Sequence, residues 1–320
     1  MRPVVLAVLG PTASGKSALG LALAERYGGE IVNCDSTAVY RGFDIGTDKP
    51  SVESRRGIPH HLIDIVEPTD VYTAAQFARD AAAVIGRIHA RGCLPMLVGG
   101  TGFYYRALTR GLFPGPGADE SLRTRLERVE DRRGVGRLHR MLHRVDPESA
   151  LRIMPRDRKR LVRALEVYFA TGRPLTAHFS ETASLIAHCD VIPVALRLQA
   201  AMTADRVARR VEAQFSRGIV DEVRGLLARG VPPTARSFGG LVYRQVMEML
   251  AGVRDEPATR ALIAQENRRY ARRQLIWFRK EPNLEWFEGP GERIETLIRV
   301  DEALVARGLQ PGSGVATRIT

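Results

Sequence analysis

The sequence predicts an α/β fold in which a parallel sheet is flanked by helices and interrupted by an inserted, all-helical domain. Over the first third of the chain, short apolar runs alternate with helical patterns, as expected for parallel strands joined by crossover helices. A glycine-rich loop follows the first apolar run directly and leads into a helical pattern. Another apolar run returns after a long helical stretch, so that stretch is predicted to be an insertion in the sheet domain.

The glycine-rich loop fits the phosphate-binding pattern G-x-x-x-x-G-K-[ST] and indicates a P-loop NTPase-like core. It consists of Gly10, Pro11, Thr12, Ala13, Ser14, Gly15, Lys16 and Ser17, between the apolar run Val4–Leu9 and the helical pattern Ser17–Arg26. The start of that helix offers unpaired N–H groups and partial positive charge to phosphate oxygens, and Lys16 adds a full charge. The Ser17 hydroxyl is placed to ligate Mg²⁺. The loop therefore predicts binding of a diphosphate or triphosphate, without deciding which reaction follows.

The composition favours a soluble globular protein with a surface for anions. Of the 320 residues 44% are hydrophobic, and no apolar run approaches the roughly 18 residues of a membrane helix. Three well-separated cysteines favour reduced thiols in a cytoplasm over a zinc site or a disulfide framework. The start, Met1-Arg2-Pro3, runs straight into the first strand, so we expect no signal peptide. The net charge of +12 suits a polyanion-binding surface, although a GC-rich genome could account for part of the arginine excess.

Polar or glycine-rich residues follow three successive predicted strands. The strand Glu30–Asn33 ends at Cys34-Asp35-Ser36, the next strand lies in Gly57–Ile65, which contains His60 and His61, and Pro95–Val98 runs into Gly99-Gly100-Thr101-Gly102. Since parallel strands end at one edge of a sheet, Asp35 and Thr101 should face the same cleft as the phosphate loop. Two alternatives remain open: Asp35 as a Mg²⁺ ligand of the Walker B kind, and Thr101 as a helix N-cap. The histidine pair lacks a third metal ligand at a plausible spacing, which favours a structural or substrate-loop role.

Helices are predicted around these strands. Thr73-Ala74-Ala75-Gln76 is a capping box that opens a helix ending at Gly92. After the apolar run Val191–Leu196 the chain is mainly helical, with a long Arg-rich helix from about Glu256 to Arg279. The predicted domains are a core in two parts (1–116 and 189–309), an inserted helical domain (117–188) and a tail (310–320) without periodicity that we expect to be disordered.

The predicted insertion is rich in arginine. It follows the break Pro114-Gly115-Pro116-Gly117 and shows helical patterns but no strand pattern. On the predicted helix Pro155–Thr171, four basic residues fall at i, i+3, i+4 and i+7: Arg156, Lys159, Arg160 and Arg163. A charge run is usually only a solvated face. A stripe of one sign without acidic partners, however, favours a polyanion as its ligand.

Taken in order, these motifs resemble those of the tRNA dimethylallyltransferase (tRNA isopentenyltransferase) family of the bacterial type. The resemblance covers roughly Val4 to Glu288 without large gaps. The matching residues are Gly10–Ser17, Asp35-Ser36, Val39–Gly42, Asp44–Thr47, Gly57–Leu62, Gly99–Tyr104, Asp157, Arg160–Glu166 and Arg272–Phe278. A phosphate loop alone would be weak evidence, but this ordered set is very specific.

The family transfers a dimethylallyl group from its diphosphate to N6 of the adenosine just 3′ of the anticodon in tRNA. The resemblance implies that Thr12–Ser17 binds the donor diphosphate with Mg²⁺, that Asp35 is the general base and that Thr101 supports the reaction. It implies tRNA contacts at Asp35, Ser36, Thr37, Ala38, Thr101, Arg123, Lys159, Arg160, Leu161, Val162, Arg163, Gly239, Tyr243 and Arg244. We further expect a monomer without a membrane partner.

The chemistry of such a transfer matches the residue types. Breaking an allylic C–O bond leaves diphosphate, whose growing charge needs Lys16, Mg²⁺ and the N–H groups of the loop. An exocyclic adenine amine is a poor nucleophile, so a carboxylate must take its proton as the new bond forms. The target base must also be turned out of the anticodon loop to reach a cleft.

Two positions depart from the family pattern, and three rival functions share the phosphate loop. The family usually has Gln at the position of Ala38, where it helps to read the target base, and Gly at the position of Val242. A prenyltransferase of free adenine nucleotide would have the same phosphate loop but would not need a basic insertion. The second rival is a P-loop kinase of a small metabolite, and the third is a nucleic-acid-binding ATPase without prenyl chemistry.

Overall fold

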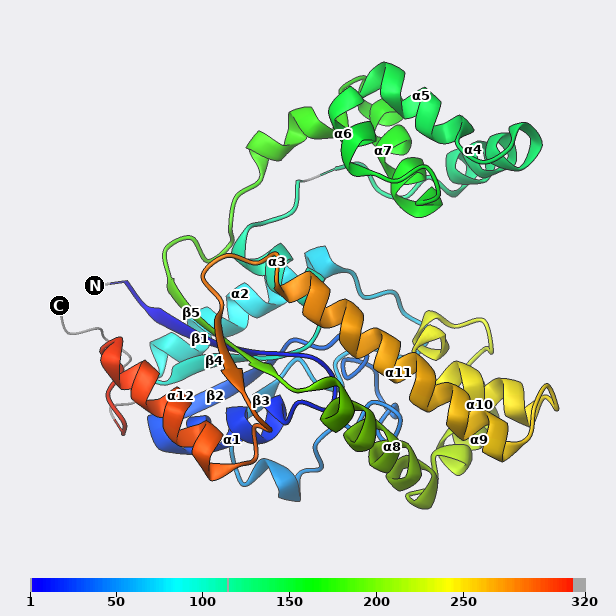
Figure 1. Cartoon of the computed structure of the whole chain (residues 1–320). Coiled ribbons are helices and arrows are strands. Elements are labelled where there is room, and N and C mark those ends of the chain that lie inside the picture. Colours follow the sequence, from blue (N-terminus) through cyan, green and yellow to red (C-terminus); the bar gives the residue numbers. More distant parts are fainter. Residues whose placement is uncertain (1, 114, 313–320) are drawn as a thin grey trace. The chain divides into compact units, whose positions relative to one another are not determined.

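The computed structural model describes residues 2–113 and 115–312, and it divides the chain into two compact units. One unit is formed by the residues up to Thr109 and from Leu185 onward, and the other by Arg110–Ser184 (Figure 1). The predicted limits of the insertion, 117 and 188, therefore both lie too far along the chain. Residues before 117 belong to the insertion because they pack on it: Arg163 Nη2 donates to the carbonyl oxygen of Pro116 at 3.0 Å, and Gly111 lies against Ala183.

The larger unit is built on one parallel sheet, as predicted. The strands follow the order β3-β2-β4-β1-β5-β6, and every recorded pairing is parallel. They are β1 (Val4–Leu9), β2 (Gly29–Asn33), β3 (His60–His61), β4 (Leu94–Gly99), β5 (Asp190–Arg197) and β6 (Glu285–Glu288). All residues of β1, β2 and β4 are buried, which explains their continuous apolar runs. The edge strand β6 was not predicted, since charged residues bound it on both sides.

Helices cover the sheet and extend beyond its carboxyl edge. They are α1 (Lys16–Tyr27), α2 (Ala74–Ala90), α3 (Gly102–Thr109), α8 (Ala200–Ser216), α9 (Ile219–Ala228), α10 (Tyr243–Leu250), α11 (Glu256–Phe278) and α12 (Ile294–Ala306). Short 3₁₀ turns occur at η1 (Glu53–Arg55) and η3 (Arg236–Gly239). The predicted capping box is confirmed: Thr73 accepts from the N–H of Gln76, whose side chain reaches back to the Thr73 backbone. One apolar core joins the sheet to α1 and α12, and a second lies among α8, α9 and α10.

The regular elements of the smaller unit are all helices among its described residues. It contains α4 (Glu120–Arg133), α5 (Arg137–Val145), α6 (Pro147–Arg152), α7 (Arg158–Thr171) and the 3₁₀ turn η2 (Leu175–Glu181). Its core of leucine, valine and alanine side chains is separate from those of the larger unit. Helix α7 begins three residues later than the predicted start at Pro155, because the Asp157 side chain caps it by accepting from the N–H of Arg160. Arg156 therefore precedes the helix instead of lying on it.

The end of the described chain is packed on the larger unit. Leu309 is buried, and the N–H of Gly312 donates to the carbonyl oxygen of Arg26 at 2.9 Å. Residues 310–312 of the predicted disordered tail are thus placed, and 313–320 lie outside the described residues. None of the helices in the described part of the chain is long and apolar enough to cross a membrane.

Candidate active site

The phosphate loop connects β1 to α1 at the carboxyl edge of the sheet. Helix α1 begins at Lys16, directly after Gly15, whose φ of +84° favours glycine. A side chain at Gly15 would also collide with Glu292 and with the backbone of Gly291. Within the loop the N–H of Ser14 donates to the carbonyl oxygen of Pro11 at 3.3 Å. The residues from Gly10 to Ser17 thus form the strand–loop–helix arrangement that the pattern predicts.

Helix α11 holds the phosphate loop against the end of β4. The buried Gln274 accepts a hydrogen bond from the N–H of Thr12 at 2.8 Å through Oε1. Its Nε2 donates to the carbonyl oxygen of Gly100 at 2.9 Å. One side chain therefore joins two segments of the edge. Gln274 lies in a segment that carries the family resemblance, but nothing in the sequence indicated this role.

Two further supports of the loop come from distant parts of the chain. Arg206 on α8 donates through Nε to the carbonyl oxygen of Ala13 at 2.6 Å and forms an ion pair with Glu292. The N–H of Gly291, between β6 and α12, donates to the carbonyl oxygen of Ser14 at 2.9 Å. Sequence reasoning missed these residues, because their only signal is their position in the folded chain.

Lys16 is partly buried and lines the cavity beside the loop. Its Nζ lies 3.4 Å from the carbonyl oxygen of Pro11. Burial lowers the pKa of Lys16 from 10.5 to about 8, although the negative charges of Asp35 and Asp48 oppose the change and the positive charge of Arg210 adds to it. A phosphate bound beside the loop would give this ammonium group a counter-ion and would stabilise its charged form.

Asp35 and Thr101 follow the ends of β2 and β4, and of the two only Asp35 lines the cavity beside the phosphate loop. The Asp35 Oδ1 atom accepts two hydrogen bonds from Thr37, one from its N–H at 2.9 Å and one from its hydroxyl at 2.6 Å. Thr101 Oγ1 accepts from the N–H of Ser36 at 3.0 Å, and the N–H of Thr101 donates to the carbonyl oxygen of Cys34 at 3.1 Å. The Thr101 carbonyl oxygen also accepts from the N–H groups of Tyr104 and Tyr105 in α3. Thr101 therefore directly precedes α3, and its hydroxyl bonds to the segment after β2.

A cavity of about 590 Å³ lies at this edge of the larger unit. Ten of the predicted site residues line it: Thr12, Lys16, Ser17, Asp35, Ser36, Thr37, Ala38, Gly239, Tyr243 and Arg244. Thr101 stands behind Ser36, and the remaining loop residues Gly10, Pro11, Ala13, Ser14 and Gly15 form the loop without lining the cavity. The structure thus places the phosphate loop, the carboxylate of Asp35 and the segment 239–244 around one space.

Three arginines that the sequence analysis did not single out also line the cavity: Arg210, Arg269 and Arg273. Arg210 on α8 donates through Nη1 to Thr12 Oγ1 at 2.8 Å and forms an ion pair with Asp48. Its guanidinium therefore lies directly against the phosphate loop, where it adds positive charge to that of Lys16. An arginine in such a place suits a diphosphate, because its planar N–H groups match phosphate oxygens.

The segment 239–244 contains one strained residue. Val242 has φ +81° and ψ −63°, a region that β-branched residues rarely adopt, yet its side chain is almost completely buried. Its N–H donates to Gln245 Oε1 at 2.8 Å. The next residue, Tyr243, is also buried, and its hydroxyl donates to Glu222 at 2.6 Å. Arg244 is half exposed and paired with Glu266.

The basic residues of the insertion do not form the unpaired stripe that was predicted. Arg123 and Arg163 both pair with Glu166, which is fully buried. Burial opposes the ionisation of Glu166, but the hydrogen bonds from the two arginines outweigh it and lower the pKa of this carboxyl. Lys159 and Arg160 are exposed, and Arg160 pairs with Asp157 at 3.2 Å.

Two predicted tRNA contacts in the insertion need correction. The side chains of Leu161 and Val162 are buried in its apolar core, because residues on the inner face of α7 pack against the neighbouring helices. They are therefore not available to an RNA.

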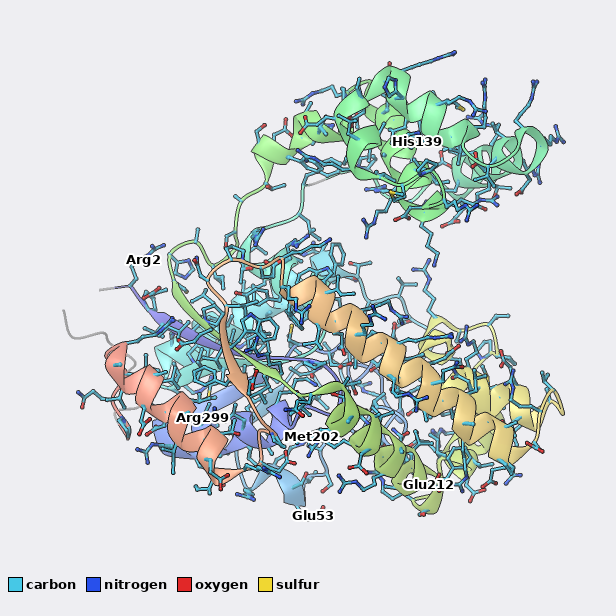
Figure 2. All side chains as sticks on the ribbon, in the orientation of Figure 1. Arg2, Glu53, His139, Met202, Glu212 and Arg299 are labelled. Carbon is cyan, nitrogen blue, oxygen red and sulfur yellow. The ribbon has the colours of Figure 1, made fainter. Side chains whose placement is uncertain are left out.

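Helices α4 and α5 carry arginines that form no ion pair among the residues described. Five of them line a groove of about 480 Å³ together with Val129 and Met141: Arg125, Arg128, Arg132, Arg133 and Arg137. Figure 2 shows nitrogen-tipped side chains projecting outward from this part of the insertion, near the labelled His139. His139 itself is held within the unit by the carbonyl oxygen of Ala150 at 2.9 Å. The unpaired positive charge of the insertion thus lies mainly on α4 and α5.

The phosphate loop suits Mg²⁺ that is bound partly by substrate phosphates better than it suits a metal ion bound by protein side chains alone. Residues 2–113 and 115–312 contain no group of three or more His, Cys, Asp or Glu side chains that could hold a metal ion. Mg²⁺ usually takes one or two protein oxygens together with substrate phosphates and waters, and the exposed Ser17 hydroxyl is such an oxygen.

The histidine pair is held by hydrogen bonds within the larger unit. His60 Nδ1 lies 2.9 Å from the carbonyl oxygen of Ile58, and His61 Nε2 lies 2.6 Å from Glu30 Oε2. Both contacts are typical of structural residues.

Known proteins resemble this chain over most of its length. The model of the IPP transferase family matches residues 38–281. A tRNA dimethylallyltransferase of Geobacter metallireducens is 47% identical over 285 residues, which cover 89% of this chain and 92% of that protein. The crystal structure of a tRNA isopentenylpyrophosphate transferase from Bacillus halodurans is 34% identical, covers 96% of both chains and gives a TM-score of 0.71.

A second solved structure supports the fold alone. It shows a eukaryotic dimethylallyltransferase acting on tRNA, with 23% identity, a TM-score of 0.75, and coverage of 96% of this chain and 78% of that one. With the family model matching most of the chain, and with the phosphate loop and Asp35 placed around one cavity, this chain belongs to the IPP transferase family.

Proposed function

We propose that this chain transfers a dimethylallyl group from dimethylallyl diphosphate to N6 of the adenosine 3′-adjacent to the anticodon in tRNA, and releases diphosphate. The observation that carries the proposal is the single cavity that Lys16 and Ser17 share with Asp35. A diphosphate site and a carboxylate base must stand at one cavity if an allylic carbon is to pass between them. Membership of the family supports the same reaction.

The donor diphosphate would occupy the start of α1. Its oxygens would accept from the loop N–H groups and from Lys16, and Arg210, which lies against Thr12, would add positive charge. Ser17 would hold Mg²⁺, which supplies further positive charge to the leaving group. As the allylic C–O bond breaks, its electron pair goes to the diphosphate, and these groups stabilise the charge that develops there.

The acceptor adenine would enter from the side of Asp35. The N6 nitrogen forms the new bond to the allylic carbon and loses one proton, which Asp35 takes as general base. Ser36 and Thr101 hold the end of β2 in place through the hydrogen bond between them. Ala38 lines the cavity but offers no hydrogen bond to the base edge.

The tRNA itself would contact both units. In the larger unit the proposed contacts are Asp35, Ser36, the backbone of Thr37, Ala38, Thr101, Gly239 and Arg244, and in the insertion they are Lys159 and Arg160, with Arg123 and Arg163 beside them. The net charge of +12 and the unpaired arginines of α4 and α5 favour a phosphate backbone as the partner. These basic residues favour tRNA over free adenine nucleotide. We expect the protein to act as a monomer in the cytoplasm.

The test of this mechanism is the Asp35→Asn variant. It should bind the donor and tRNA normally but lose roughly 10²- to 10⁴-fold in turnover, because only proton removal is impaired. Glu266→Gln is the matched control, since Glu266 is another carboxylate on the cavity wall that is paired with Arg244. It should keep turnover within a few-fold. Loss of Mg²⁺-dependent donor binding in Asp35→Asn would instead identify Asp35 as a metal ligand.

A further inference from the structure

The two hydrogen bonds that Asp35 accepts through Oδ1 both come from Thr37. The hydroxyl of Thr37 lies 2.6 Å and its N–H 2.9 Å from this oxygen. No hydrogen bond to Oδ2 is recorded from any described residue, although Asp35 lines the cavity. The carboxylate is therefore bound on one side only. We propose that Thr37 is a positioning residue that fixes Asp35 with Oδ2 free to take the proton of the amine, an inference that rests on the proposed function.

This arrangement suits a group that must change its protonation state. An ionised carboxylate accepts strongly, and an O–H···O⁻ bond of 2.6 Å lies in the range of charge-assisted hydrogen bonds. When a proton arrives at Oδ2, Oδ1 becomes the carbonyl oxygen of a carboxylic acid and still accepts both bonds. Thr37 therefore supports Asp35 before and after the transfer, so the side chain does not have to turn during the reaction.

The same geometry limits what else Thr37 can do. A hydroxyl has one proton, and that of Thr37 is donated to Asp35, so only its lone pairs are left for a base. Thr37 therefore cannot supply a donor in place of the amide that Ala38 lacks. This hydroxyl acts through Asp35, and its removal should change the rate of the chemical step instead of the binding of tRNA.

A purely local role is the alternative that the experiment must separate. The carbonyl oxygen of Thr37 accepts from the N–H of Tyr40 at 3.3 Å, so the residue also belongs to a turn. Thr37→Val keeps the shape of the side chain, including the methyl group that lies beside Gly240, and keeps the backbone N–H bond. It replaces only the hydroxyl, with a methyl group of similar size. Thr37→Ser keeps the hydroxyl and removes the methyl group.

The experiment measures kcat and both KM values for prenyl transfer to tRNA by the full chain. Thr37→Val should lower kcat about tenfold, because a loosened base spends less time in the reactive geometry. The KM values for dimethylallyl diphosphate and tRNA should stay unchanged, and Thr37→Ser should stay within about twofold of the natural protein. An unchanged kcat in Thr37→Val would overturn the proposal. A loss that appears only in the KM for tRNA would assign Thr37 to base recognition and would overturn it equally.

A double variant separates this inference from the proposed function. If Thr37 acts through Asp35, Thr37→Val should have no further effect on the residual single-turnover rate of Asp35→Asn. An equal loss in both backgrounds would mean that Thr37 acts independently, and the inference would fail while the transferase function stands. Full activity of Asp35→Asn would instead remove Asp35 as the base. No transfer to tRNA by the natural protein would refute the proposed function itself.

Discussion

Binding of inorganic diphosphate should weaken as the pH rises through about 8, because Lys16 loses its proton there. Burial lowers the pKa of Lys16 from 10.5 to about 8 in the free protein. A bound diphosphate stabilises the ammonium form, so the pKa of Lys16 is higher in the complex than in the free protein. Below pH 7 the lysine is charged in both states and contributes no pH dependence. Above pH 8 the free protein must take up a proton in order to bind.

The size of the effect follows from the protonated fraction. With a pKa of about 8, this fraction falls about tenfold between pH 7 and pH 9. The contribution of Lys16 to affinity should fall by the same factor, which corresponds to about 1.4 kcal/mol.

Isothermal titration calorimetry with inorganic diphosphate and Mg²⁺, from pH 6.5 to 9.5, measures this contribution. Lys16→Arg is the control, since the guanidinium stays charged throughout and its curve reports the ionisation of the ligand alone. The difference in slope between the two proteins isolates Lys16. Parallel curves would refute the reasoning, as would a natural protein that gains affinity with rising pH relative to the control.

Three further predictions concern the strained turn, the basic insertion and the adenine pocket. Val242→Gly should be more stable than Val242→Ala by about 1 kcal/mol in urea unfolding, because a positive φ penalises every residue with a side chain. At Val246, which lies inside helix α10, Val246→Gly should instead be less stable than Val246→Ala. If glycine were the more stable replacement at both positions, or alanine at both, the account would be contradicted. The double variant Lys159→Glu with Arg160→Glu should weaken tRNA binding, and the slope of log affinity against log salt concentration should fall by about one unit per lost phosphate contact. Diphosphate binding should stay unchanged, and an unaltered slope would mean that these two residues only face solvent. Ala38→Gln should raise kcat/KM for tRNA a few-fold and leave the KM for the donor unchanged, since one hydrogen bond contributes about 0.5–1.5 kcal/mol. If this variant transferred the prenyl group to tRNA and the natural protein did not, the natural protein would use another substrate.

The sheet could be predicted from the sequence wherever its strands are buried on both faces. Val4–Leu9 and Val191–Leu196 read as continuous apolar runs, because central parallel strands have no solvent face. The edge strands were predicted poorly. Gly57–Ile65 contributes only His60–His61 to the sheet, and the short β6 was missed. At an edge the strand is held by one neighbour and needs few apolar residues, so the pattern that identifies it is weak.

The candidate site, like the sheet, could be predicted from the sequence only in part. Asp35 could be placed at the cavity beside the phosphate loop because the carboxyl ends of parallel strands share an edge, whereas Thr101 at the end of β4 does not line that cavity. Gln274, Arg206 and Gly291 could not be predicted, since they meet the loop only through folding. Some signals were present but not used: Arg163 and Glu166 are three positions apart on one helix, a spacing that brings opposite charges together.

The most direct test of the central claim is prenyl transfer to unmodified tRNA from labelled dimethylallyl diphosphate, with AMP as the competing acceptor and ATP hydrolysis assayed separately. The account predicts label on N6 of the adenosine 3′ of the anticodon and one diphosphate released per transfer. It also predicts no label on AMP and no ATP turnover. Label on AMP with unmodified tRNA would contradict the account and favour the free-nucleotide enzyme, and ATP turnover without any transfer would contradict it in favour of a kinase or an ATPase.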